Sequence, residues 1–137
     1  MTLTPPVVSS LTAGILIAVQ VVLMLSVVRE RRRARQSLGD GGHPRLLQAI
    51  RRHGNFAENA AIFVAGFALL ELSGASRLSV AVLCALFIAG RISHIIGLSR
   101  EKTVNRLRVG GIALTAFVGL AVATRLVVYA VPLLLAP

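Results

Sequence analysis

The stretch RRHGNFAE, residues 51–58, runs directly into the apolar segment Ala60–Leu70, and the length of that segment decides the fold. A helix that crosses a bilayer needs roughly 20 mostly apolar residues, so Ala60–Leu70 cannot cross on its own. If the helix ends close behind this segment, its membrane-buried part begins near His53. Asn55 and Glu58 then lie inside the membrane, where an unpaired polar group costs about 2–4 kcal/mol.

Three polar side chains of this stretch share one face of the expected helix. Arg51, Asn55 and Glu58 are spaced i, i+4 and i+7, which places them on one stripe. Polar groups inside a membrane are tolerated where they pair with one another or line a cavity. We therefore interpret the stripe as part of a functional site, although an internal polar network without a ligand would use the same residues.

Composition indicates a membrane protein. The chain has 137 residues, of which 55% are hydrophobic and 15% charged, and a mean hydropathy of +0.80; soluble domains carry about 25% charged residues. Four apolar spans with short connections fill the chain, which predicts one all-α domain, an integral membrane four-helix bundle. The helices are expected at about residues 7–35, 45–72, 77–97 and 107–134.

The basic residues form two clusters between the apolar spans. Eight lie in residues 29–52 and five in residues 91–108. With four helices both clusters fall on one side of the membrane, and the positive-inside rule predicts that this side is cytoplasmic and that both termini lie outside. Membrane lipids with anionic head groups are the expected partners of this charge. Nucleic acid is not expected, because no aromatic residue interleaves with the basic ones.

A second set of polar residues is expected on the same side of the membrane. In the third helix Arg91 and His94 lie one turn apart, and two arginines open the fourth helix. Such a cationic, partly desolvated pocket suits an anionic, peptide-like ligand, because arginine pairs bidentately with carboxylates. The candidate site residues are Arg31, Arg51, Asn55, Glu58, Arg91, His94, Arg106 and Arg108.

Other polar residues are expected to be structural. Glu71 lies toward the outer end of its helix, and we expect it to pair with Arg125 or Arg77 near the outer interface. Cys84 is expected to be a small core residue, because no cation lies within a turn or two to activate its thiol. Metal binding is not expected, since the three histidines share no usable helical spacing.

The RxxxNxxE motif of residues 51–58, with RxxH at residues 91–94 and arginines opening the fourth helix, resembles the MAPEG family, the membrane-associated proteins in eicosanoid and glutathione metabolism. The loop LGDGG, residues 38–42, and the segment HGNFAE, residues 53–58, look like the bacterial branch of this family. Fourteen arginines against one lysine also suggest a GC-rich bacterial genome. The expected location is therefore the bacterial plasma membrane.

The resemblance implies a left-handed four-helix bundle assembled as a homotrimer, with glutathione as cosubstrate at the subunit interfaces near the cytosolic surface. Arg51, Asn55 and Glu58 would contact glutathione. Arg91 and His94 would support it from the third helix.

The resemblance also implies the chemistry. Arg108 or Arg106 would stabilise the glutathione thiolate, and the spacing does not decide between them; Arg31 would line the same site. A thiol with a pKa of about 8.5 is mostly protonated at neutral pH, and a nearby guanidinium favours the thiolate. The thiolate would attack a lipophilic electrophile from the bilayer, in a transferase or peroxidase reaction.

The sequence departs from the family pattern at three positions. Asn59 follows the RxxxNxxE motif, and Ile96 and Leu98 stand near the end of the third helix, where family members carry tyrosines. Several hydrogen bonds to glutathione are therefore absent. The alternatives are a non-catalytic MAPEG-like protein that binds a lipid or a partner, and a small transporter with the buried charges along its path.

Overall fold

The computed structural model describes residues 5–99 and 105–136, and the regular structure in them is helical. The helices are α1 (Val7–Ala34), α2 (Pro44–Leu72), α3 (Arg77–Leu98) and α4 (Arg106–Leu135). Each boundary lies within one residue of its predicted position, and all four helices are long and apolar enough to cross a membrane. The predicted all-α membrane bundle is confirmed. Arg100 and Lys102 of the second basic cluster lie outside the described residues.

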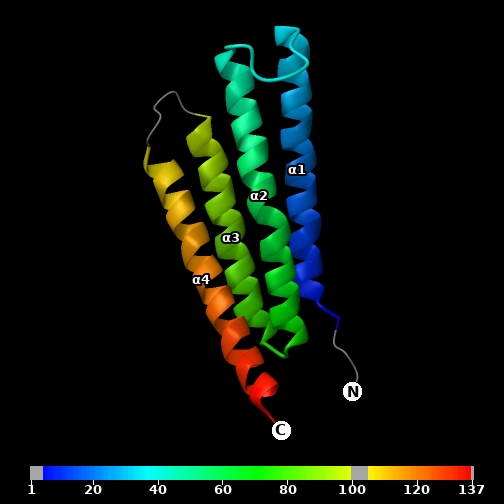
Figure 1. The fold of residues 1–137 in the computed structure, drawn as a ribbon, viewed down its shortest axis with the longest axis vertical. Coiled ribbons are helices and arrows are strands. Elements are labelled where there is room, and N and C mark those ends of the chain that lie inside the picture. Colours follow the sequence, from blue (N-terminus) through cyan, green and yellow to red (C-terminus); the bar gives the residue numbers. More distant parts are fainter. Residues whose placement is uncertain (1–4, 100–104, 137) are drawn as a thin grey trace.

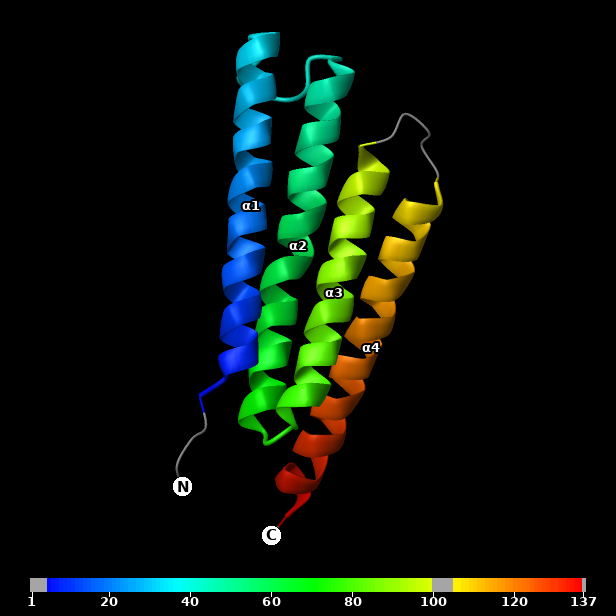
Figure 2. The ribbon, with the colours of Figure 1, turned by 180° about the vertical axis from the view of Figure 1, so that it is seen from behind.

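The bundle is open rather than square. Figures 1 and 2 show the helices in the order α1, α2, α3, α4 across the molecule, with α2 and α3 in the middle. Within the described residues, α1 and α4 each pack on both α2 and α3 but not on one another. The α1–α2 connection lies at one end of the molecule. The α2–α3 turn, the start of α1 and the end of α4 lie at the other (Figure 1).

Three phenylalanines fill the contact between the two central helices. The rings of Phe63 and Phe87 stack with their centroids 4.2 Å apart, and Phe67 packs edge-on against Phe87 at 5.8 Å. Cys84 is buried in the same core, as predicted. Because lipid tails are as apolar as these rings, close packing and dispersion hold the helices together here.

Glu71, at the end of α2, caps the beginning of α1. Its carboxylate accepts hydrogen bonds from the backbone N–H of Val8 at 3.1 Å and from the N–H and hydroxyl of Ser9 at 2.9 and 2.8 Å. The first N–H groups of a helix have no partner within it and carry partial positive charge. The predicted direct pairing of Glu71 with Arg125 or Arg77 is therefore wrong, although the charge of Arg77 acts on the carboxylate from a distance. No ion pair between described residues includes Glu71, because the first turn of α1 supplies the positive end.

We expect Glu71→Gln to lower the free energy of unfolding by about 1–3 kcal/mol, because the amide nitrogen cannot accept a hydrogen bond and the negative charge is lost. Denaturant unfolding in detergent measures this change. Arg125→Gln, at an exposed position on α4, is the control and should stay within about 0.5 kcal/mol of the wild type. Equal stability of the two variants would contradict the capping role.

Candidate functional site

A polar pocket of about 300 Å³ opens between α2, α3 and α4, toward the end of the molecule that carries the α1–α2 connection. Five of the eight predicted site residues line it. The polar lining consists of Arg51, Asn55 and Glu58 from α2, His94 from α3 and Arg108 from α4, and the apolar lining consists of Ile50, Gly54, Leu98 and Ile112. The spacing argument on α2 and the residues of α3 and α4 thus converge on one place.

Arg91 is the buried cation next to this pocket. Its side chain is on α3 and the residue is only 3% exposed. The guanidinium donates to the backbone carbonyl of Asn55 at 3.1 Å and to the side-chain oxygen of the same residue. Its Nε is buried without a hydrogen-bond partner, and no described carboxylate lies within ion-pair distance. Arg91 therefore fastens α3 to α2, and its charge interacts with that of Glu58 without a direct ion pair.

Asn59 stands where the family pattern has tyrosine, and its side chain turns back into its own helix. The Asn59 amide donates to the backbone carbonyl of Asn55 at 2.9 Å. That carbonyl therefore accepts from two side chains, one on α2 and one on α3.

His94 and its neighbours hold the first turn of α4 against α3. The Nδ1 atom of His94 lies 3.3 Å from the backbone oxygen of Arg108, and the hydroxyl of Ser93 donates to the carbonyl of Leu107 at 2.9 Å. Asn105 caps α4, because its side-chain oxygen accepts from the N–H of Arg108 at 3.0 Å. These bonds set the place of Arg108 in the pocket wall.

Two predicted residues do not reach this pocket within one chain. The guanidinium of Arg31 donates to the carbonyls of Ser37 at 2.9 Å and Gly39 at 3.0 Å, and so orders the connection that follows α1. Arg106 is exposed at the first position of α4, whereas Arg108 lines the pocket. An Arg31 side chain in the site would have to come from a second copy, and that role stays a prediction.

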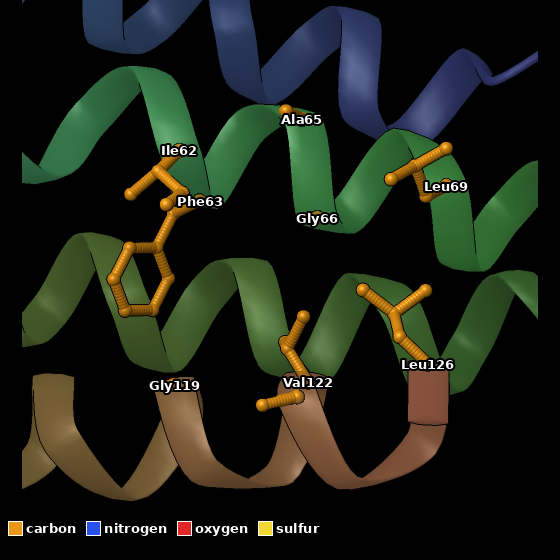
Figure 3. A pocket seen from close by; sticks show the side chains of 9 residues that line it. Ile62, Phe63, Ala65, Gly66, Leu69, Gly119, Val122 and Leu126 are labelled. Atoms are coloured by element: carbon orange, nitrogen blue, oxygen red, sulfur yellow. The ribbon is translucent and has the colours of Figure 1, made fainter. Parts of the chain in front are cut away.

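A groove between α2 and α4 continues from the polar pocket. A cavity of about 590 Å³ shares Asn55 and Ile112 with the polar pocket, and it shares Phe63 and Gly119 with a third cavity of about 400 Å³. Figure 3 shows this third cavity, with the Phe63 ring reaching from α2 toward α4 and no side chain at Gly119. The third cavity is lined by apolar residues and glycines alone: Ile62, Phe63, Ala65, Gly66, Leu69, Gly119, Val122, Ala123 and Leu126. Polarity therefore falls along the groove.

The α4 wall of this groove is not among the predicted site residues. Ile112, Thr115 and Gly119 follow Arg108 at i+4, i+7 and i+11, which places all four on one helix face. Their helical spacing could have identified this face from the sequence, since the same argument identifies residues 51–58 on α2.

Four membrane-crossing helices with a cationic pocket near one end define an integral membrane protein whose site is built from three of its helices. The chain matches the MAPEG family over residues 9–126, which is most of its length, and it belongs to that family.

Two similar proteins are known from Escherichia coli. The chain is 38% identical over 71 residues to the inner membrane protein YecN of strain K12, and it has the same identity to YecN of strain O6:H1 CFT073. Each match covers 52% of this chain and 54% of YecN, so the chain spans about half the length of the curated relatives it matches. No solved structure matches.

We expect Asn55→Ala to lower the free energy of unfolding by about 1–3 kcal/mol, because Arg91 loses an acceptor while its charge stays buried. Asn59→Ala, which removes one hydrogen bond within α2, is the matched control and should cost less than about 1 kcal/mol. Denaturant unfolding in detergent compares the two variants. A larger loss in Asn59→Ala than in Asn55→Ala would show that the Arg91 bond contributes little.

Proposed function

We propose that this chain is a membrane-bound glutathione transferase or peroxidase, in which an arginine stabilises the glutathione thiolate. The observation that carries the proposal is the set of cations at the pocket, with Arg51 and Arg108 in its wall and Arg91 buried beside it. Among the described residues, Glu58 is the one carboxylate in the pocket wall, so the three arginines leave an excess of positive charge there, and buried charge is costly unless it is balanced. An anionic ligand in the pocket would balance this excess.

The charges of glutathione match the pocket. Its two carboxylates suit bidentate pairing with arginine, and its single ammonium group suits the carboxylate of Glu58. In this assignment the thiol faces Arg108, whose guanidinium favours the thiolate at neutral pH. Arg91 and His94 hold other residues of the site in place. Arg91 bonds to Asn55, and His94 contacts the backbone oxygen of Arg108.

The groove along α2 and α4 gives the second substrate a route from the bilayer. A lipophilic electrophile would enter the apolar part and meet the thiolate at the polar end. In the transferase reaction a carbon–sulfur bond forms while the leaving group departs with its electron pair, or a strained ring opens, and the anion formed takes a proton. In the peroxidase reaction the thiolate attacks the terminal oxygen of a hydroperoxide and the O–O bond breaks. The alkoxide takes a proton, and a second glutathione converts the sulfenic acid to disulfide and water.

The family resemblance implies a homotrimer, and two features support a neighbouring copy that completes the site. Glu58 is exposed on one chain, at a depth where lipid would surround it, and an acidic side chain in that setting costs about 2.5–3.5 kcal/mol. Arg31 reaches its own connection rather than its own pocket. A neighbouring copy would cover Glu58 and would place its own Arg31 in the pocket.

The proposed location is the bacterial plasma membrane, with the basic connections in the cytoplasm and both termini outside. The printed name of the E. coli relatives, an inner membrane protein, supports this compartment. The positive-inside pattern supports the orientation.

A non-catalytic member of the family that binds a lipid or a partner is the second candidate, and the three departures from the family pattern favour it. The Asn59 amide is bonded within its own helix, Leu98 adds only apolar surface to the pocket, and Ile96 is 45% exposed. The apolar side chains of Ile96 and Leu98 supply no hydrogen bond to a ligand.

We expect purified protein to bind glutathione and to show the ultraviolet absorbance of a thiolate. Arg108→Ala should abolish that absorbance and lower turnover of an electrophilic test substrate about 10²-fold, the effect of removing one group that stabilises an anion. Arg106→Ala, two residues away and exposed, is the control and should retain both the thiolate absorbance and the turnover. Binding without turnover would favour the second candidate, and absence of binding would refute the proposal.

We expect Arg31→Ala and Arg108→Ala chains to complement one another when they are mixed in one oligomer. If each site takes these residues from different copies, random mixing leaves about a quarter of the sites intact. Native mass spectrometry of the mixture should show three copies, and turnover should rise above that of either variant alone. Turnover no higher than the better single variant would place both residues in sites of one chain.

A further inference from the structure

Two glycines allow α3 and α4 to approach closely beside the polar pocket. A Cβ atom at Gly97 would lie 2.6 Å from the backbone nitrogen of Arg108. A Cβ atom at Gly111 would lie 2.6 Å from the backbone oxygen of Gly90 and 2.7 Å from the backbone nitrogen of His94. Because these neighbours are backbone atoms, no side-chain rotation relieves the overlap. Any larger residue at either position must push the two helices apart.

Hydrogen bonds across the same contact depend on this close approach. The amide of Asn105 donates to the carbonyl of Gly97 at 2.8 Å, and the hydroxyl of Ser93 donates to the carbonyl of Leu107 at 2.9 Å. His94 approaches the backbone oxygen of Arg108 at 3.3 Å. Each bond joins α3 to residues 105–108, so a wider spacing of the helices weakens all of them together.

The neighbouring glycine on α4 has no such constraint. A Cβ atom at Gly110 would meet nothing within 4 Å, although this residue directly precedes Gly111. The requirement for glycine therefore belongs to the face of α4 that touches α3, not to the helix as a whole. Gly110 offers a control with the same substitution in the same helical turn.

We infer that Gly97 and Gly111 are positioning residues for Arg108: by leaving no side chain between α3 and α4, they set the place of its guanidinium in the pocket wall. The catalytic consequence rests on the proposed function, whereas the geometric consequence does not. A misplacement of about 1 Å in a reacting group can cost about 10²-fold in rate, and a Cβ atom at either glycine requires a shift of several tenths of an ångström or more.

The first test follows the thiolate of bound glutathione against pH in full-length protein in detergent. In Gly97→Ala and Gly111→Ala we expect the thiolate to form at higher pH, nearer the pKa of about 8.5 of a free thiol. At a pH low enough to keep the bound thiol protonated, glutathione affinity should change less than about twofold, because Arg51 and Glu58 lie on α2, away from the substitutions. In Gly110→Ala the thiol of bound glutathione should titrate as it does in the wild type. A loss of stability alone would not move this titration.

The second test needs no glutathione. The sequence has one cysteine, Cys84, which is buried, so Arg108→Cys supplies a single reactive thiol in the pocket wall. We expect its rate of modification by a charged thiosulfonate to change at least about threefold when either Gly97→Ala or Gly111→Ala is added, since thiol reactivity follows local access and charge. Adding Gly110→Ala should leave the rate unchanged.

The two tests separate the inference from the proposed function. A wild type without bound thiolate would refute the proposed function, and the modification rates would still decide the inference. The inference is overturned if monodisperse Gly97→Ala and Gly111→Ala proteins match Gly110→Ala in both measurements. If neither folds, Gly90→Ala replaces them, because its Cβ atom would lie 3.2 Å from its nearest neighbours. It should give a smaller change in the same direction, and no change would overturn the inference.

Discussion

The hydrogen bonds between the Arg91 guanidinium and Asn55 fix the relation between the two central helices. Inside a bilayer no water can replace a missing acceptor, so a buried guanidinium must keep its bonds to protein. That requirement holds α3 in one register against α2. The stacked rings of Phe63 and Phe87 agree with the same register farther along the helices. The contact between His94 and the backbone oxygen of Arg108 extends this register to the first turn of α4.

The sequence was sufficient for the helices and for one wall of the site. The bilayer fixes how long a span must be, so the apolar spans together with their flanking residues located the four helices closely. The stripe of Arg51, Asn55 and Glu58 was predictable because its spacing lies within a single helix. The choice between Arg106 and Arg108 was not, because the rotation of α4 depends on its contact with α3. The close contact at Gly97 sets it.

Other features could not be predicted because their partners are backbone groups or lie far along the chain. A search for cations could not identify the partner of Glu71, which is the first turn of a helix. Arg31 likewise bonds to carbonyls of its own connection, which no side-chain motif reveals. The side chains of Gln20 and His53 meet at 2.8 Å between α1 and α2, and 33 positions separate them in the sequence. Only the packing of the two helices brings them together.

The carboxylate of Glu71 also bears on how the chain enters the membrane. Ser9 and Glu71 are 62 positions apart, so α1 is synthesised long before its cap. Until α2 has crossed, the opening N–H groups of α1 must stay bonded to water or to lipid head groups. The first helix can therefore settle at its final depth only together with the second. We therefore expect the two helices to reach their final place during biogenesis as one hairpin.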